Sequence, residues 1–524
     1  MSEFDLSVAE QRDLPDLRIA ERVLELVYGH PLVVDEVLPD ALPNTPRLDV
    51  IAVDVDDREG PLQFNAWVAD RWLNRTLRVS GTFEDPACIT VRSTDVIPPV
   101  GTDEFVLAAR IVAASGRLER LLTPASLYRP MPPLVTTRDD TGTLRRLVNV
   151  GVHTPEARIV HRIWTVDPIA GVIVDDRRDV PRPGLNECEP TAPAPVSGGG
   201  VHDSSQVHVV VSGGGGVLWE LDVRRPGSSS GLVGSGVELR NVRYRGRKVL
   251  HRAHVPMLNV KYLQPTGNCG PTYRDWQNEE TLFEAVGHDP VAGYRVCTQP
   301  PRTILDSGTD QGNFNGVAFW MDGGRLRIVS EMAAGWYRYI SEWWLDADGS
   351  IHPRFGFAAT NNRCTCQGHA HNVYWRLDFD IDSPAPNTAE EFNDPPIFAG
   401  TNWHAKSYEI MRRRDPSRKR KWRVRQSDSE HGYEIVPGAH DGTYDQYGAG
   451  DVWFLNYRGT EIDDGVGFTT VEAQSRVRID NWVDGESLIR KDIVVWYAGH
   501  FLHDHDTNPD AHGQLLGPDL MPIG

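Results

Sequence analysis

Two histidines separated by a single residue, His369 and His371, begin the stretch of this sequence best suited to metal chemistry. The residues after them alternate between apolar and polar side chains, as in a β-strand whose successive side chains point to opposite faces. Both imidazoles then share the apolar face with Val373 and Trp375. Neutral imidazole nitrogens that converge from one strand suit copper or zinc. Because a pair is an incomplete site, at least one more ligand has to come from elsewhere in the chain.

A second apolar strand, starting at Asp492, ends in three histidines that can supply this ligand: His500, His503 and His505. Without a third ligand, a His-X-His pair is more often two packed, hydrogen-bonded side chains.

Cys364 and Cys366 precede the pair and offer a second, thiolate-containing metal site. Two small buried residues of a strand are the alternative reading of these cysteines.

Two helix-then-strand units are expected before this region. Residues 17–28 have the apolar spacing of a helix and are followed by three strand-like segments, which predicts a small α+β domain over 1–85. A second helix is expected to begin with Thr102 as its N-cap, in an α+β domain over 86–180. Richness in Pro, Gly and Ser predicts a linker over 181–232.

Strand patterns rich in Trp, Tyr, Val and Ile recur from residue 233 to 524, separated by turn dipeptides such as Asp348-Gly349. Helical periodicity nearly vanishes there. The predicted fold is therefore a pair of α+β modules followed by a large antiparallel β-sandwich, which would carry the metal site.

Composition excludes some partners. The net charge of -19 argues against nucleic acid and anionic membranes, which both reward a basic face. The first residues lack a basic, apolar leader and no stretch reaches the ~20 apolar residues of a membrane span, so we expect a cytoplasmic protein. Six cysteines are too few for a disulfide scaffold in a chain of 524 residues.

Several segments, in order along the chain, resemble those of the copper amine oxidases. They are Gly236 to Arg247, Asn259 to Tyr262, His369-Ala-His371 with Arg376-Leu-Asp378, Asp492 to Trp496 with His503, and Asp519 to Pro522. The resemblance implies the fold of that family, in which small α+β domains precede a β-sandwich. It also selects His503 as the third copper ligand.

The resemblance further implies that Tyr337 is the precursor of topaquinone, a quinone cofactor that copper and O2 make from a tyrosine. Trp336 and Arg338 flank it where the family has an asparagine and an acid. The permanent cation of Arg338 is a candidate to engage a carboxylate of the substrate.

For the reaction, the resemblance implies oxidation of a primary amine to an aldehyde, with O2 consumed and hydrogen peroxide and ammonia released. Asp275 is the expected general base, with Glu279 in reserve, and Tyr262 is expected to hydrogen-bond the quinone. An aspartate in this role near neutral pH needs a pKa raised by burial.

A peripheral calcium-type site is also implied. It would use the carboxylates of Asp378, Asp380 and Asp492 and the carbonyls of Phe379 and Ile493, oxygen donors that suit a hard cation. The simpler alternative is a solvated strand face with alternating acids.

Two other functions stay open. One is a mononuclear copper enzyme with unmodified Tyr337 that acts on an amino-acid-like or secondary-metabolite substrate. The other is a catalytically silent sandwich that binds a partner. The resemblance also implies a homodimer, whichever function holds, with the segment 393–457 as a candidate for its arms.

Overall fold

The computed structural model describes most of the chain. The described residues are 4–11, 15–34, 46–56, 58, 62–94, 96–120, 125–131, 133–138, 140, 142, 144–153, 161–179, 205–263, 272–359, 368–398, 400–443, 450–469, 471–503 and 515–524. Cys364, Cys366 and His505, named above as candidate ligands, lie outside them. Within the described residues, no helix has the length and apolar character needed to span a membrane.

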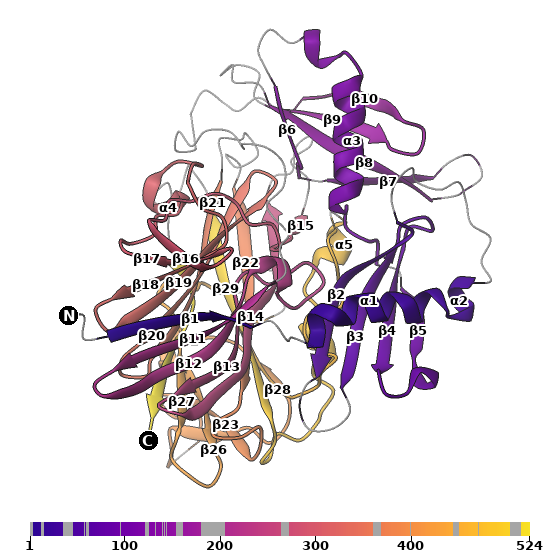
Figure 1. Cartoon of the computed structure of the whole chain (residues 1–524). Coiled ribbons are helices and arrows are strands. Elements are labelled where there is room, and N and C mark those ends of the chain that lie inside the picture. The colour runs from indigo at the N-terminus through magenta and orange to yellow at the C-terminus, as the bar shows by residue number, and fades with distance from the viewer. Residues whose placement is uncertain are drawn as a thin grey trace.

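Two large, mostly antiparallel sheets face each other and form the sandwich on the left of Figure 1, as predicted. The ten-stranded sheet has the order β1 (Phe4–Glu10), β11 (Gln206–Gly213), β12 (Gly216–Arg224), β13 (Glu238–Tyr244), β14 (Arg247–Tyr262), β22 (His369–Phe379), β29 (Ile493–His503), β28 (Val452–Asn456) and β25 (Ile410–Arg412), with β15 (Thr272–Arg274) paired to β14. The twelve-stranded sheet has the order β16 (Gly287–Val291), β17 (Tyr294–Cys297), β18 (Val317–Asp322), β19 (Arg325–Ala334), β20 (Tyr337–Asp346), β21 (Ile351–Ala359), β31 (Asp519–Ile523), β27 (Gly432–Val436), β26 (Lys421–Gln426), β23 (Asn387–Phe392) and β24 (Trp403–Ala405), with β30 (Leu515–Leu516) paired to β21.

One continuous apolar core fills the space between these sheets. Val373 of β22 and Tyr339 of β20 belong to it, so the predicted apolar face of β22 does point into the sandwich. The opposite face of β22 is buried as well, because Tyr374 packs in a second cluster with Ile479. Burial on both faces makes β22 a rigid support for its side chains.

Two smaller α+β modules lie beside the sandwich, on the right of Figure 1. The first contains α1 (Pro15–Tyr28), α2 (Pro31–Val34), β2 (Leu48–Asp56), β3 (Gln63–Asp70), β4 (Arg75–Thr82) and β5 (Thr90–Thr94). The second contains α3 (Thr102–Ala114), β6 (Ser126–Tyr128), β7 (Leu134–Arg138), β8 (Leu144–His153), β9 (His161–Asp167) and β10 (Val172–Asp179). In each, an apolar helix face covers its own sheet: Val23 belongs to the same buried cluster as Phe64, and Phe105 to the same cluster as Val150. The sandwich segment adds two short helices, α4 (Ile304–Ser307) and α5 (Glu472–Ser475).

The sequence-based boundaries need three corrections. The linker expected over 181–232 is wrong from Gln206 onward, because β11 and β12 pair with each other and belong to the ten-stranded sheet. β1, which the prediction assigned to the first module, pairs with β11 and therefore belongs to the ten-stranded sheet. β5 pairs with β4, so the first module continues past residue 85. Strand pairing over long sequence separations is invisible to local composition.

Two local predictions have different outcomes. The Asp348-Gly349 turn is confirmed, because β20 and β21 pair antiparallel and Gly349 has a φ of +95°. The helix α3 begins one residue earlier than expected, with Gly101 rather than Thr102 at the N-cap. The Glu104 carboxylate accepts a hydrogen bond from the Gly101 amide and so caps the helix from within.

Candidate functional site

Three neighbouring strands bring the candidate residues to one end of the ten-stranded sheet. In the ladder, Tyr262 of β14 lies opposite His369 of β22, and His369 lies opposite His503 of β29. Their rings are in contact, with centroids 5.3 Å apart for Tyr262 and His369 and 4.7 Å apart for His369 and His503. The register therefore unites segments that are more than one hundred residues apart in the chain.

The three expected copper ligands converge. His369 and His371 have ring centroids 4.8 Å apart, and Nδ1 of His503 lies 3.3 Å from Nε2 of His369. All three side chains are buried. Two nitrogens at roughly 2.0–2.1 Å from one metal ion and at a near-tetrahedral angle would be separated by about 3.3 Å. The donor types and this spacing fit a copper ion bound by imidazoles.

Tyr337 reaches the histidines from the opposite sheet. A two-residue hairpin, Gly335-Trp336, joins β19 to β20, and Tyr337 is the first residue after it. Gly335 has a φ of +59°, and a side chain there would meet Met131 at 2.1 Å, so glycine is required. The Tyr337 ring centroid lies 5.9 Å from that of His369 and 5.2 Å from that of His371.

A chain of hydrogen bonds orients the Tyr337 ring. Its hydroxyl shares a hydrogen bond of 2.5 Å with the Tyr262 hydroxyl, and the Trp336 indole donates to Tyr262 at 3.2 Å. Trp336 is therefore linked to the Tyr337 hydroxyl through the hydroxyl of Tyr262. Burial raises the pKa of Tyr337 well above its ordinary value, and the neighbouring Tyr262 adds to this shift.

Asp275 follows β15 directly and is fully buried. The Tyr339 hydroxyl donates a short hydrogen bond to its Oδ2, whereas Oδ1 has no hydrogen-bond partner among the described residues. Tyr339 also stacks on Tyr337, with centroids 5.7 Å apart and an interplanar angle of 16°. Burial raises the pKa of Asp275 to about 7, and the Tyr339 bond opposes part of that rise. This carboxyl is therefore matched to proton transfer near neutral pH.

Tyr339 is a site residue that the sequence analysis did not single out. The signal was present, because Tyr337 and Tyr339 are two residues apart on one strand and must share a face. What the sequence lacked was the partner, Asp275, which comes from the other sheet.

Two charged residues near the site are already engaged. Glu279, the reserve base, forms a buried ion pair with Arg129. Arg338 donates to both carboxylate oxygens of Asp310 at 2.7 and 2.8 Å, and to the carbonyls of Gly335 and Tyr337. The idea that Arg338 engages a substrate carboxylate is therefore wrong: its guanidinium is buried and satisfied by the protein.

The acidic residues expected for a calcium-type site also come together. Asp378, Asp380 and Asp492 each offer an oxygen within 4.8 Å of the others, and Phe379 lies opposite Ile493 in the ladder. Asp378 is buried, so this strand face is not the solvated one of the alternative reading.

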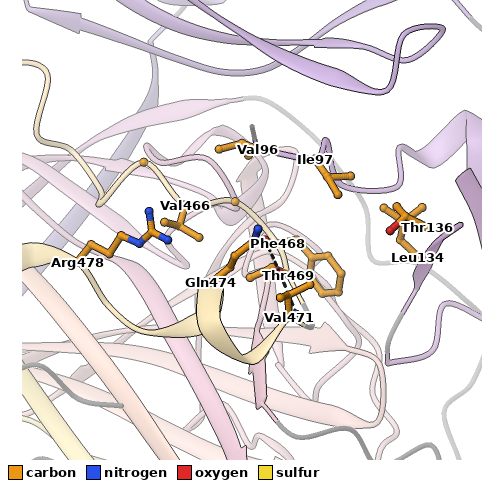
Figure 2. Close-up of a pocket in the computed structure, with 12 residues that line it drawn as sticks. Val96, Ile97, Leu134, Thr136, Val466, Phe468, Thr469, Val471, Gln474 and Arg478 are labelled. Carbon is orange, nitrogen blue, oxygen red and sulfur yellow. Dashed lines mark hydrogen bonds between the residues drawn. The ribbon is translucent and has the colours of Figure 1, made fainter. Parts of the chain in front are cut away.

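A cavity of about 350 Å³ lies near the site, between the second module and the loop that leads to α5. Val96, Leu134 and Phe468 are among its apolar lining residues (Figure 2). The Phe468 ring packs edge-on against the Trp276 indole at 5.3 Å, and Trp276 follows Asp275 in the chain. Phe468 thus contacts both the cavity and the residue that follows Asp275.

Comparisons with known proteins agree with this architecture. No family model and no curated protein sequence matches the chain. Among solved structures, the copper-containing benzylamine oxidase from Hansenula polymorpha is similar over 92% of this chain and 94% of its own, with a TM-score of 0.56 and 13% identity. The Pichia pastoris lysyl oxidase is similar over 98% of this chain and 91% of its own, with a TM-score of 0.57 and 11% identity. The chain therefore has the fold of the copper amine oxidases over nearly its whole length, at a sequence identity of only 10–13%.

Proposed function

We propose that this protein is a copper-dependent oxidase of primary amines that uses Tyr337 as the precursor of a topaquinone cofactor. The observation that carries the proposal is the convergence of His369, His371 and His503 beside the Tyr337 ring, with the buried carboxyl of Asp275 linked to it through Tyr339. The shared fold supports it, because the two similar structures above are described as amine or lysyl oxidases.

Each residue has a physical role in this proposal. When bound, copper supplies the redox chemistry with O2 that oxidises a neighbouring tyrosine, and the quinone so made accepts electrons from the amine. His369, His371 and His503 would hold the metal as neutral donors. Tyr262 holds the Tyr337 ring by its hydroxyl.

Asp275 is the group that would take the proton from the carbon next to the amine nitrogen. With Oδ2 bonded to Tyr339, Oδ1 is the oxygen left to accept that proton. Because Tyr337 and Asp275 are buried, bulk water is kept from the reacting groups. The cavity beside Phe468 is the proposed route by which the amine approaches.

A direct test is to load the purified protein with copper in air and look for a quinone. We expect stoichiometric copper, visible absorbance, a positive quinone stain and a mass increase confined to the peptide that contains Tyr337. Tyr337→Phe should bind copper and stay colourless, because phenylalanine lacks the hydroxyl that activates the ring. A colourless wild-type protein with copper bound would refute the quinone.

That last outcome would favour a second candidate, a mononuclear copper enzyme with unmodified Tyr337. It is motivated by Trp336, whose indole bonds Tyr262 where the resemblance leads one to expect an asparagine. An unchanged mass of the Tyr337 peptide together with O2 consumption would identify it. Absence of both copper and O2 consumption would leave the third candidate, a silent binding domain.

Tyr339→Phe tests the positioning of the base. Removing a hydrogen bond to a charged acceptor costs roughly 1.5–3 kcal/mol, equivalent to about one to two pH units. The bond lowers the pKa of Asp275, so its loss should move the acid limb of kcat/KM to higher pH. The pH profile is the measurement, and Phe355→Leu, which changes a ring packed on Tyr339 without touching the bond, is the control. An unmoved limb would exclude this role for Tyr339.

A further inference from the structure

The cluster of Asp378, Asp380 and Asp492 contains a cation that belongs to the protein. Arg58, two residues after β2 of the first module, lies among the three carboxylates. One of its terminal nitrogens is 2.8 Å from Asp378 and 3.4 Å from Asp380, and the other contacts Asp492. The flat guanidinium also lies over the Tyr457 ring, 3.7 Å from its centroid.

This contact is largely sealed from solvent. The side chain of Arg58 is 16% exposed, that of Asp378 is 0% exposed and that of Asp380 is 4% exposed. Carboxylates buried to this degree need a positive partner.

The charges around the cluster balance without a metal ion. Three carboxylates face Arg58, Arg376 at 3.4 Å from Asp378, and Lys248 at 3.8 Å from Asp380. A divalent cation added to this arrangement would bring excess positive charge and meet the guanidinium directly.

We propose that Arg58 replaces the metal ion at this site and acts as a built-in cation that binds the first module to the sandwich. The residues as they stand do not fit calcium, because a guanidinium takes the position that the ion needs. The forked donors of arginine suit several carboxylates at once, which a lysine cannot match.

The position of the contact explains how it stabilises the fold. Asp378 lies near the end of β22, Asp380 directly follows that strand, and Asp492 directly precedes β29. These are the two strands that carry His369, His371 and His503 at their other end. Arg58 thus fastens the far ends of both strands, seven residues or roughly 23 Å along β22 from His371. A second link from the same module, the ion pair between Asp54 and Arg252, reinforces the attachment.

Terbium luminescence tests the proposal without reference to catalysis. A terbium ion in the place of the guanidinium would lie beside Tyr457 and be excited through that ring. We expect no luminescence above background for the wild-type protein and clear luminescence for Arg58→Ala, competed away by calcium with a Kd on the order of 10⁻⁴–10⁻³ M. Calcium should also raise the Tm of Arg58→Ala, which should be lower than that of the wild type, and should leave the wild-type Tm unchanged.

Matched variants localise the signal. Adding Asp380→Asn to Arg58→Ala should abolish terbium binding. Arg78→Ala removes another arginine that links the first module to the sandwich, through the carbonyl of Thr460, and should gain no terbium signal. If Arg58→Ala does not fold, Arg58→Gln serves in its place. Tight terbium or calcium binding by the wild-type protein at this cluster, or none by the Arg58 variant, would overturn the proposal, whether or not the protein oxidises amines.

Discussion

Replacing Asp275 by asparagine is expected to lower kcat for a primary amine by roughly 10²- to 10⁴-fold, the usual contribution of a positioned general base. Asparagine has nearly the same shape and still accepts the Tyr339 hydrogen bond, but it cannot take a proton. Copper content and the colour of the cofactor should therefore be unchanged. Steady-state and single-turnover rates are the measurement.

The reserve candidate provides the control. Glu279→Gln should lower the Tm, because it leaves the buried Arg129 guanidinium without a charged partner, a change that costs up to about 3–5 kcal/mol. Its effect on kcat should be much smaller than that of Asp275→Asn. If Glu279→Gln abolished turnover and Asp275→Asn did not, the roles of the two acids would be reversed.

The wild-type pH profile follows from the same carboxyl. Asp275 acts as a base only when ionised, and its pKa is about 7. The fraction of ionised Asp275 rises as the pH increases through 7, so kcat/KM should rise over that range and fall at lower pH. This acid limb should be missing from the residual activity of Asp275→Asn.

Replacing His503 by alanine is the second change with a large expected effect. It removes one of the three imidazoles and leaves a pair, so we expect loss of stoichiometric copper and, with it, loss of the quinone colour of Tyr337. Metal analysis after copper loading and desalting is the readout. The apoprotein should remain folded, because the His503 side chain lies at the end of β29.

His500→Asn is the matched control for that experiment. His500 lies three residues earlier on the same strand, on the opposite face, and bonds Asn372 rather than the histidine cluster. Its replacement perturbs a buried imidazole of β29 equally but should leave copper bound. Equal copper loss in both variants would mean that the strand, and not the ligand, is responsible.

Much of the fold could be predicted from local patterns. The helices near residues 17–28 and 102–114, the β-rich remainder and the Asp348-Gly349 hairpin all follow from periodicity and turn chemistry, which act over a few residues. The linker prediction failed from Gln206 onward because the glycines from 213 to 216 form the turn of the hairpin between β11 and β12, which composition alone does not distinguish from a loop. The expected homodimer stays a prediction.

The sequence alone determined which side chains share a strand face: His369 with His371, Tyr337 with Tyr339, and Asp378 with Asp380, because a strand has a period of two. Only the tertiary structure decided what lies opposite each pair. In it, Tyr339 hydrogen-bonds Asp275, Arg338 forms an ion pair with Asp310, and Arg58 of the first module lies in the acidic cluster. Such contacts depend on the register and packing of strands that are distant in the chain, and no local pattern encodes them.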